Sequence, residues 1–152
     1  MKYTKSVSRT MANPSVFLDA NVLLYTDDPR YPDKREIAVR LVEQHVTQKT
    51  GAVSLQVLGE YFYNARRKMN LDVRLARQRV TFFSRLLRFQ PNLSDVFAAI
   101  DLHQFHHFRY WDAMVVHSAM QCGCRILYSE DMHSGHKIDN LEIVNPFASS
   151  HF

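Results

Sequence analysis

The chain has 152 residues, 46% of them hydrophobic, which fits one globular domain and excludes a largely disordered protein. No apolar run approaches the roughly 18 residues that span a membrane, and the basic N-terminus lacks the apolar stretch of a secretory signal. The net charge of +4 is unevenly distributed, since residues 64–90 carry eight basic side chains against one acidic, whereas residues 16–63 and 91–152 are net acidic. The basic segment favours a polyanionic partner, and the acidic segments favour a bound cation.

In chain order, the apolar pattern predicts short strands that alternate with helices. We expect a strand at 16–18, a helix over 33–49, a brief strand at 52–53, helices over 54–69, 72–88, 94–106 and 110–121, and strands at 125–128 and 141–144. This alternation predicts an α/β fold with a parallel sheet covered on both faces.

The domain organisation expected from the sequence is simple. Residues 1–14 are predicted to be a flexible basic tail, and residues 15–152 a single domain. The only cysteines, Cys122 and Cys124, are poorly spaced to bridge each other and have no second pair with which to bind zinc. Two half-buried thiols of this kind suit a reducing compartment, so we expect a cytoplasmic protein.

Four carboxylates lie near predicted strand ends or on a buried helix. Asp19 follows the first strand directly, and Asp131 comes three residues after the strand at 125–128. Asp112 is in the first turn of an apolar helix, and Glu60 lies about two turns into its own helix. An unpaired carboxylate in apolar surroundings costs several kcal/mol, so a hard divalent cation would compensate the four acids.

Each acid also has an ordinary structural explanation. Asp112 and Asp131 could stabilise helix N-termini, Asp19 could open a turn with Asn21, and Glu60 could be a surface residue. Because parallel sheets bind ligands at the carboxyl ends of their strands, four acids in such places together favour one shared site.

Four segments in this order resemble the signature segments of PIN-domain nucleases, and the match is closest to the VapC-type toxins of bacterial toxin–antitoxin pairs. The segments are LDAN at 18–21, VLGEY at 57–61, YWDA at 110–113 and YSEDM at 128–132, and the closing IVNPF at 143–147 is also similar. The resemblance covers about residues 15–147. The departures are the basic tail and a histidine-rich stretch before Asp112.

The resemblance implies a fold and a metal site. The fold is a three-layer α/β/α sandwich with a mostly parallel central sheet of about five strands. The implied metal ligands and catalytic residues are Asp19, Glu60, Asp112 and Asp131, which would hold one or two Mg²⁺ or Mn²⁺ ions directly or through water. Of the neighbouring polar residues, Asn21 and Ser129 would orient Asp19 and the water, and Glu130 would be a helper at most.

The implied activity is that of a divalent-metal-dependent endoribonuclease, the toxin of a toxin–antitoxin pair. Such an enzyme hydrolyses RNA phosphodiester bonds and leaves 5′-phosphate and 3′-hydroxyl ends. The implied partners are RNA, a small antitoxin protein and a second copy of the chain in a homodimer. The alternative is a catalytically silent PIN-like protein that binds RNA or acts as a scaffold, but the presence of all four acids favours the enzyme.

Basic and aromatic residues suggest how RNA would be bound. Four arginines are spaced to line one face of the predicted helix over 72–88, namely Arg74, Arg77, Arg85 and Arg88. They form either the solvated face of an amphipathic helix or a track for an RNA backbone, and the scarcity of balancing acids favours the track. Tyr61 and Trp111 are predicted to contribute to an apolar rim of the site, although such residues are more often core.

Overall fold

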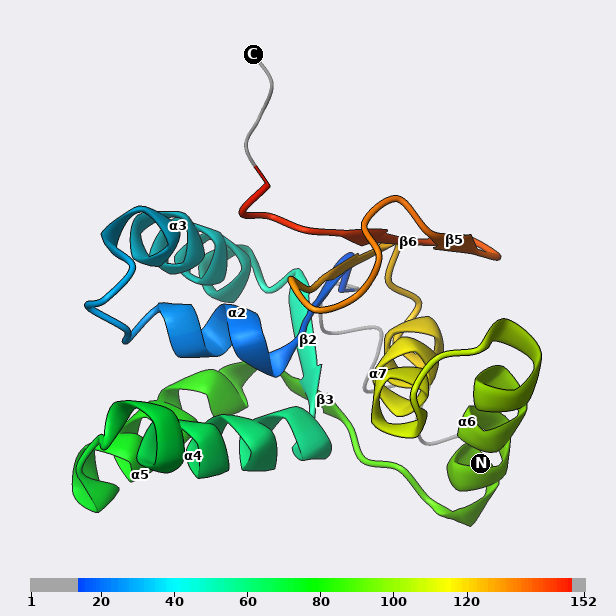
Figure 1. The fold of residues 1–152 in the computed structure, drawn as a ribbon, viewed down its shortest axis with the longest axis horizontal. Helices are drawn as coiled ribbons and strands as arrows, with labels where there is room; N and C mark the ends of the chain where they lie inside the picture. Colours follow the sequence, from blue (N-terminus) through cyan, green and yellow to red (C-terminus); the bar gives the residue numbers. More distant parts are fainter. Residues whose placement is uncertain (1–13, 149–152) are drawn as a thin grey trace.

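The computed structural model describes residues 14–148, and its elements form a six-stranded sheet flanked by helices (Figure 1). The predicted basic tail at 1–14 therefore lies almost entirely outside the described residues. The elements are β1 (Val16–Leu18), α2 (Ala20–Tyr25), α3 (Pro32–Gln48), β2 (Gly51–Ser54), α4 (Leu55–Met69), α5 (Val73–Phe83), the 3₁₀ turn η1 (Ser84–Leu86), β3 (Leu87–Phe89), α6 (Leu93–His106), α7 (Tyr110–Gln121), β4 (Ile126–Tyr128), β5 (Lys137–Ile138) and β6 (Leu141–Val144).

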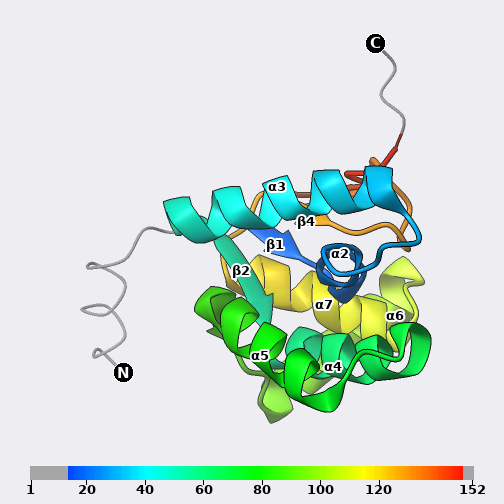
Figure 2. The same ribbon diagram turned by 90° about the vertical axis from the view of Figure 1, so that its left-hand side faces the viewer.

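The sheet has the strand order β3-β2-β1-β4-β6-β5. All neighbouring strands pair in parallel except β5, which runs antiparallel to β6 at one edge. Helix α3 lies on one face of the sheet and α7 on the other (Figure 2). The expected α/β fold, a three-layer sandwich with a mostly parallel sheet, is therefore confirmed, with one strand more than the five expected.

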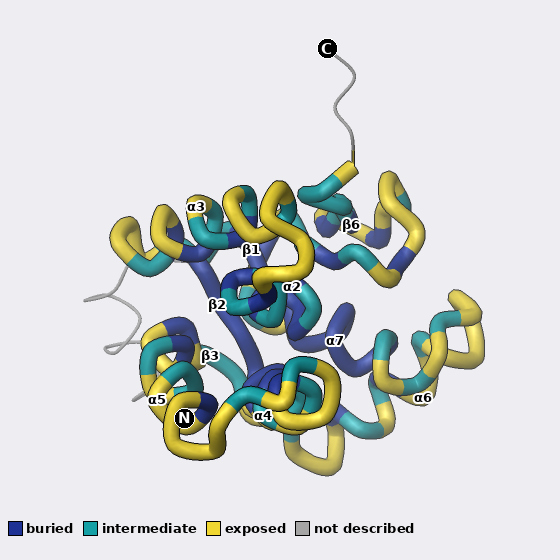
Figure 3. Tube along the Cα trace, turned by 60° about the vertical axis from the view of Figure 1, so that its left-hand side comes forward, coloured by how far each residue is buried: buried dark blue, intermediate teal, exposed yellow. Residues whose placement is uncertain are grey.

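The core surrounds the neighbouring inner strands β1 and β2, whose residues are buried throughout. Figure 3 shows the same division along the trace, because the central strands and α7 are buried while the outer surfaces of α3, α5 and α6 are exposed. Strands buried on both faces have no polar alternation, which is why they read as continuous apolar runs in the sequence. Within residues 14–148, no helix combines the length and the apolar character needed to cross a membrane.

Two strand-to-helix junctions without loops matter for the site. Asp19 follows β1 and caps α2, and its carboxylate accepts a hydrogen bond from the backbone N–H of Ala20. Ser54 ends β2 and caps α4, with its hydroxyl oxygen accepting from the N–H of Val57 at 3.3 Å. Both helices therefore start at the carboxyl edge of the sheet and carry their first side chains there.

Several elements differ from the sequence prediction. The predicted helix over 72–88 was too long, since α5 ends at Phe83 and the chain continues through η1 into β3. The apolar spacing of Ala76, Val80, Phe83 and Leu87 continues the helical period, but pairing of β3 with β2 prevails over it. The short elements α2 and β5 were missed, because six and two residues are too few for a periodic pattern.

Candidate active site

The ends of β1 and β4 bring the first part of the site together. Leu18 is in register with Tyr128, and the N–H of Asp19 donates to the Tyr128 carbonyl oxygen at 3.0 Å. The residues that follow the two strands, Asp19 and Ser129, are both buried and hydrogen-bonded to each other. Two segments that are 110 residues apart in the sequence thus meet through the pairing of neighbouring parallel strands.

Asp19 has a buried carboxylate with neutral hydrogen-bond donors. The residue is 7% exposed. One carboxylate oxygen accepts from the N–H of Ala20 at 2.8 Å, and the other accepts from the Ser129 hydroxyl at 2.8 Å and the Asn21 amide at 3.4 Å. These donors fix the position of the carboxylate but carry no positive charge that would neutralise it.

Asn21 connects Asp19 to the loop after β4. Its Nδ2 atom donates to the Asp131 carboxylate at 3.1 Å and to the Ser129 hydroxyl oxygen at 3.3 Å, while its Oδ1 accepts from the N–H of Glu130 at 3.1 Å. Asp131 is exposed, so its position depends on this contact. Asn21 and Ser129 therefore hold Asp19 and Asp131 in a fixed relation.

Glu60 lies on α4 and Asp112 on α7, two helices on the side of the sheet opposite α3 (Figure 2). Glu60 is half-buried on α4 and accepts from the Gln56 amide at 3.1 Å. The same amide donates to the carbonyl oxygen of Trp111 at 3.4 Å, which connects α4 to the first turn of α7. Asp112 follows in that turn, and its carboxylate lies 3.6 Å from Nε of Arg109, a side chain that is 83% exposed.

The pKa shifts indicate that the acids influence one another. Burial raises the pKa of Asp19 to about 7, against the hydrogen bonds from Ser129 and Ala20, and the charges of Glu60 and Asp112 add to the rise. Burial also raises the pKa of Glu60, and Asp112 contributes in the same direction. The pKa of Asp112 is raised by burial and by Asp131, while Arg109 lowers it. Without a cation, the site therefore resists becoming fully ionised.

The carboxylate oxygens of these acids are suitable ligands for a divalent cation, but the protein would supply only a few of its ligands. Asp19 offers a buried carboxylate without a cationic partner among the described residues, and oxygen ligands are those that Mg²⁺ and Mn²⁺ prefer. Within residues 14–148, no three His, Cys, Asp or Glu side chains are grouped closely enough to hold a metal ion by themselves. Such an ion would therefore be held by one or two of these carboxylates, with water and phosphate as its other ligands.

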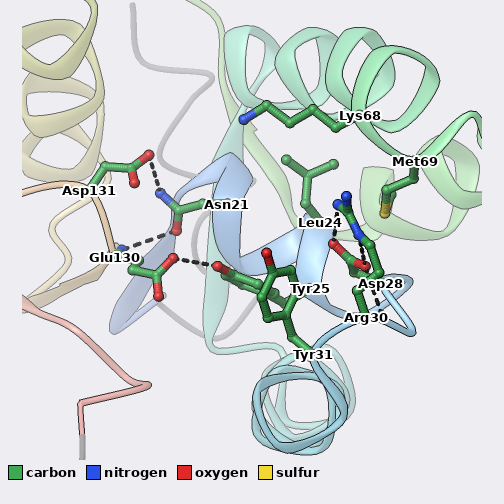
Figure 4. Close-up of a pocket in the computed structure, with 10 residues that line it drawn as sticks. All are labelled: Asn21, Leu24, Tyr25, Asp28, Arg30, Tyr31, Lys68, Met69, Glu130 and Asp131. Carbon is green, nitrogen blue, oxygen red and sulfur yellow. Dashed lines mark hydrogen bonds and ion pairs between the residues drawn. The ribbon is translucent and has the colours of Figure 1, made fainter.

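Glu130 faces away from the other acids. Its carboxylate forms an ion pair with Lys34 and accepts from the Tyr25 hydroxyl at 2.6 Å. Only its backbone N–H takes part in the site, through the bond to Asn21. The Glu130 side chain instead lines a pocket that adjoins the acids (Figure 4).

The four predicted RNA-binding arginines do not share one helix, so that part of the prediction was wrong. Arg74 and Arg77 are exposed on α5, and Arg85 is exposed in η1. Arg88 lies on β3, is half-buried, and donates to the carbonyl oxygen of Lys49 at 3.1 Å. The geometry leaves Arg74, Arg77 and Arg85 as the members of this set that are exposed to a polyanion.

The predicted apolar rim is only partly present. Tyr61 is fully buried, and its hydroxyl donates to the Asp27 carboxylate at 2.7 Å, so it belongs to the core and not to the rim. Trp111 is 61% exposed directly beside Asp112, where it can contact a ligand of the acids. The sequence could not separate the two aromatics, because both sit next to an acid in an apolar segment.

Several contributors were missed in the sequence. Gln56, which positions Glu60, and Lys34, which neutralises Glu130, carry no motif signal of their own. The i, i+4 spacing of Gln56 and Glu60 on a predicted helix was an available sign of contact. The Lys34–Glu130 pair joins segments 96 residues apart, so only the fold brings it together.

Comparison with known proteins bears on the fold. Neither protein-family models nor curated protein sequences give a match. Among solved structures, the sarcin-ricin-loop-cleaving toxin VapC20 of Mycobacterium tuberculosis superposes with a TM-score of 0.58 and 17% identity over 77% of this chain and 90% of that chain. A chain of a toxin–antitoxin complex from Klebsiella pneumoniae superposes with a TM-score of 0.61 and 16% identity over 88% and 98% of the two chains. At these identities the likeness establishes the fold, and the chain has the PIN-like fold that its sequence segments led us to expect.

Proposed function

We propose that the protein is a divalent-metal-dependent endoribonuclease and the toxin of a toxin–antitoxin pair. The observation that carries the proposal is the buried Asp19 carboxylate, which has no cationic partner among the described residues. The charges of Glu60 and Asp112 raise its pKa, and Asp131 in turn raises the pKa of Asp112. The fold shared with VapC20, which its name describes as cleaving the sarcin-ricin loop, supports ribonuclease chemistry.

The chain's own residues have separate tasks in this proposal. Asp19 and Asp112 would hold the ion, with Glu60 and Asp131 contributing directly or through water. When bound, Mg²⁺ or Mn²⁺ would supply Lewis acidity toward the scissile phosphate and activate water for attack. Ser129 and Asn21 fix the position of the Asp19 carboxylate by hydrogen bonds, and the carboxylates would offer acceptors for the proton that the attacking water loses.

Metal removal tests the activity directly. We expect the purified chain to cut single-stranded RNA in Mg²⁺ or Mn²⁺ and to lose cleavage in excess chelator, because the acids alone supply no counter-charge for the phosphate. Gel analysis of total RNA, followed by mapping of the cut ends, would measure both the loss and its reversal when metal is restored. Full cleavage in chelator would rule out the proposed mechanism.

The same assay separates the enzyme from the alternative that the sequence left open. A catalytically silent PIN-like RNA-binding or scaffold protein would bind RNA in gel-shift experiments but cut none at any metal concentration. The unneutralised charge of the acids favours the enzyme, because a scaffold gains nothing from buried carboxylates that oppose folding.

The exposed arginines are proposed to guide the RNA backbone. Replacing Arg74, Arg77 and Arg85 together by Gln should weaken RNA binding and flatten its dependence on salt, since each lost phosphate contact removes about one unit from the log–log slope. Fluorescence anisotropy across a salt series would measure the slope. Replacing the exposed Arg125 by Gln provides a control, and it should leave the slope unchanged. An unchanged slope in the triple variant would show that Arg74, Arg77 and Arg85 do not contact RNA.

A small antitoxin protein is the partner that accompanies this function. The complex from Klebsiella pneumoniae supports a partner of this kind. We propose that the partner places an Arg or Lys beside Asp19 and Asp112, where the missing positive charge would be supplied. Copurification with the product of the neighbouring gene, together with a toxicity assay of the chain alone, tests this. The homodimer implied by the sequence resemblance stays a prediction, for which sedimentation analysis is the measurement.

A further inference from the structure

A pocket of about 180 Å³ opens beside the candidate active site (Figure 4). It shares Asn21 and Asp131 with that site and extends to the end of α4, at Lys68 and Met69, and to the loop between α2 and α3. A polymer bound at the acids would therefore have room for its next unit in this pocket.

Most charges that line the pocket are already neutralised. Asp28 is bound by Arg30, whose Nε and Nη2 atoms lie 2.9 and 2.8 Å from its two carboxylate oxygens, and Glu130 is bound by Lys34. The N–H of Arg30 also donates to Asp28, which fixes the loop between α2 and α3 against the pocket. Because the opposite charges within each of these two ion pairs cancel, neither pair attracts a charged ligand strongly.

Lys68 is the cation of this pocket whose charge is not used in the fold. It is exposed in the last turn of α4 and makes no hydrogen bond or ion pair with any residue between 14 and 148. Its side chain extends toward the side of the pocket where Asn21 and Asp131 lie (Figure 4). Arg66 and Arg67 precede it on α4 and are also exposed, but Arg66 donates to the carbonyl oxygen of Leu71 at 2.7 Å and Arg67 lies over the Tyr63 ring. The unused charge of Lys68 suits an anion that lies next to the acids, such as the phosphate of a nucleotide.

Tyr31 provides a fixed aromatic surface at the same pocket. The residue is 44% exposed, and its ring packs edge-on against Tyr25, with 5.6 Å between the ring centroids. The Arg30 guanidinium and the Lys34 amine each lie 5.6 Å from the centroid of the Tyr31 ring. A ring held in this way loses little side-chain entropy when a flat ligand stacks on it, and nucleobases are such ligands.

We propose that this pocket binds the nucleotide next to the scissile bond, with Lys68 contacting its phosphate and Tyr31 stacking on its base. The inference rests on the proposed ribonuclease function and assigns it a substrate class, single-stranded RNA, because only an unpaired base can leave its stack to lie on a side chain. Stacking accepts every base, so the pocket selects strandedness and not sequence. A docked peptide segment would need an acidic side chain for Lys68, whereas an RNA strand brings a phosphate with every nucleotide.

The experiment uses the full chain in chelator, where RNA binds without being cut, and a short single-stranded RNA that carries 2-aminopurine. Tyr31→Ala should weaken binding roughly tenfold and abolish the quenching of the probe, because one stacked base is lost. Lys68→Gln should lower affinity and reduce the log–log salt slope by about one unit. Tyr31→Phe, which keeps the ring, should bind like wild type.

Two matched controls stand outside the pocket. Tyr63→Ala removes an exposed tyrosine on α4, and Lys137→Gln removes an exposed lysine on β5; both variants should bind RNA and quench the probe like wild type. Thermal melting of every variant shows whether the fold is retained. The expected result is a loss confined to the Tyr31→Ala and Lys68→Gln variants.

The outcomes separate this inference from the function on which it rests. If wild type cuts RNA in Mg²⁺ and all variants bind alike, the pocket assignment is wrong and the ribonuclease stands. If wild type binds RNA with the expected variant pattern but cuts none, the pocket stands and the proposed activity fails. If Tyr31→Ala and Lys68→Gln bind RNA normally but no longer copurify with the neighbouring gene product, the pocket is a protein-docking site and the inference is overturned.

Discussion

Asp19→Asn is expected to reduce the rate of RNA cleavage by more than about 100-fold. This loss exceeds the one typically seen when a residue that only hydrogen-bonds to a metal ligand is replaced. The change keeps the shape of the side chain and its cap of α2, because Asn is as good an N-cap as Asp. When its single amide oxygen accepts from the N–H of Ala20, its amide nitrogen can donate to the Ser129 hydroxyl oxygen, which replaces the bond that the carboxylate accepts. The missing property is the negative charge, so cation binding and catalysis should fail while the fold survives. Cleavage assays in Mg²⁺, paired with thermal melting, measure the two effects separately.

The matched control for this variant is Asp101→Asn, which removes an exposed carboxylate of α6. It should cut RNA at the wild-type rate. An active Asp19→Asn enzyme would remove Asp19 from the proposed mechanism. A variant that is inactive only because its melting temperature has collapsed would make Asp19 a structural residue instead.

The second large effect is a loss of stability of the metal-free protein as pH rises. The pKa of Asp19 is about 7 in the folded chain against an ordinary value of 3.8, so the folded state holds this proton more tightly than the unfolded state. Below pH 3.8 Asp19 is protonated in both states and does not change the free energy of unfolding. Between pH 3.8 and about 7 its ionisation lowers the free energy of unfolding by about 1.4 kcal/mol per pH unit, to a total of about 4 kcal/mol as an upper value.

Other groups modify this slope in directions that the structure defines. The raised pKa values of Glu60 and Asp112 add to the loss with rising pH. Asp28, held by Arg30, and Asp95, held by His117, have lowered pKa values, so their stabilisation is lost as pH falls toward those values. The Asp19 contribution is therefore measured as a difference between wild type and Asp19→Asn.

The measurement is urea unfolding in chelator at several pH values between 4 and 8. The free energy of unfolding of wild type should fall relative to that of Asp19→Asn as pH rises, so that the variant is the more stable protein near pH 8. If the two proteins show the same dependence of unfolding free energy on pH, the pKa of Asp19 is not raised by folding. The buried charge of Asp19 would then no longer be an argument for a metal site. Added Mg²⁺ should narrow the difference, since a bound cation favours the ionised carboxylate.

Periodicity predicted most of the fold because each long helix has one face to bury. Helix α7 begins and ends at the residues that the apolar pattern predicted. The failures have physical causes. The period of α5 runs on into β3, where strand pairing decides the outcome, and α2 is held by its cap at Asp19 and its packing against α4 more than by any pattern.

The candidate site was predictable only as a set of residues. The order of the four acids suggested a common edge, because parallel strands end together. The sequence could not predict the direction in which each side chain points. Glu130 and Asp131 are neighbours, yet one carboxylate pairs with Lys34 and the other accepts from Asn21. Adjacent loop residues point to different surfaces according to contacts made 96 and 110 residues away, and no local rule encodes these.

The distance along the chain between Asp19 and Ser129 also has a consequence for protein synthesis. The ribosome makes a chain from its N-terminus, and N-terminal segments begin to fold first. Asp19, Asn21 and Glu60 are therefore synthesised well before Asp112, Ser129 and Asp131. If the chain cuts RNA, it is harmless to the ribosome that makes it until strand β4 has emerged and paired with β1. A nascent chain halted before β4 would be an inert precursor, which gives an antitoxin time to meet it.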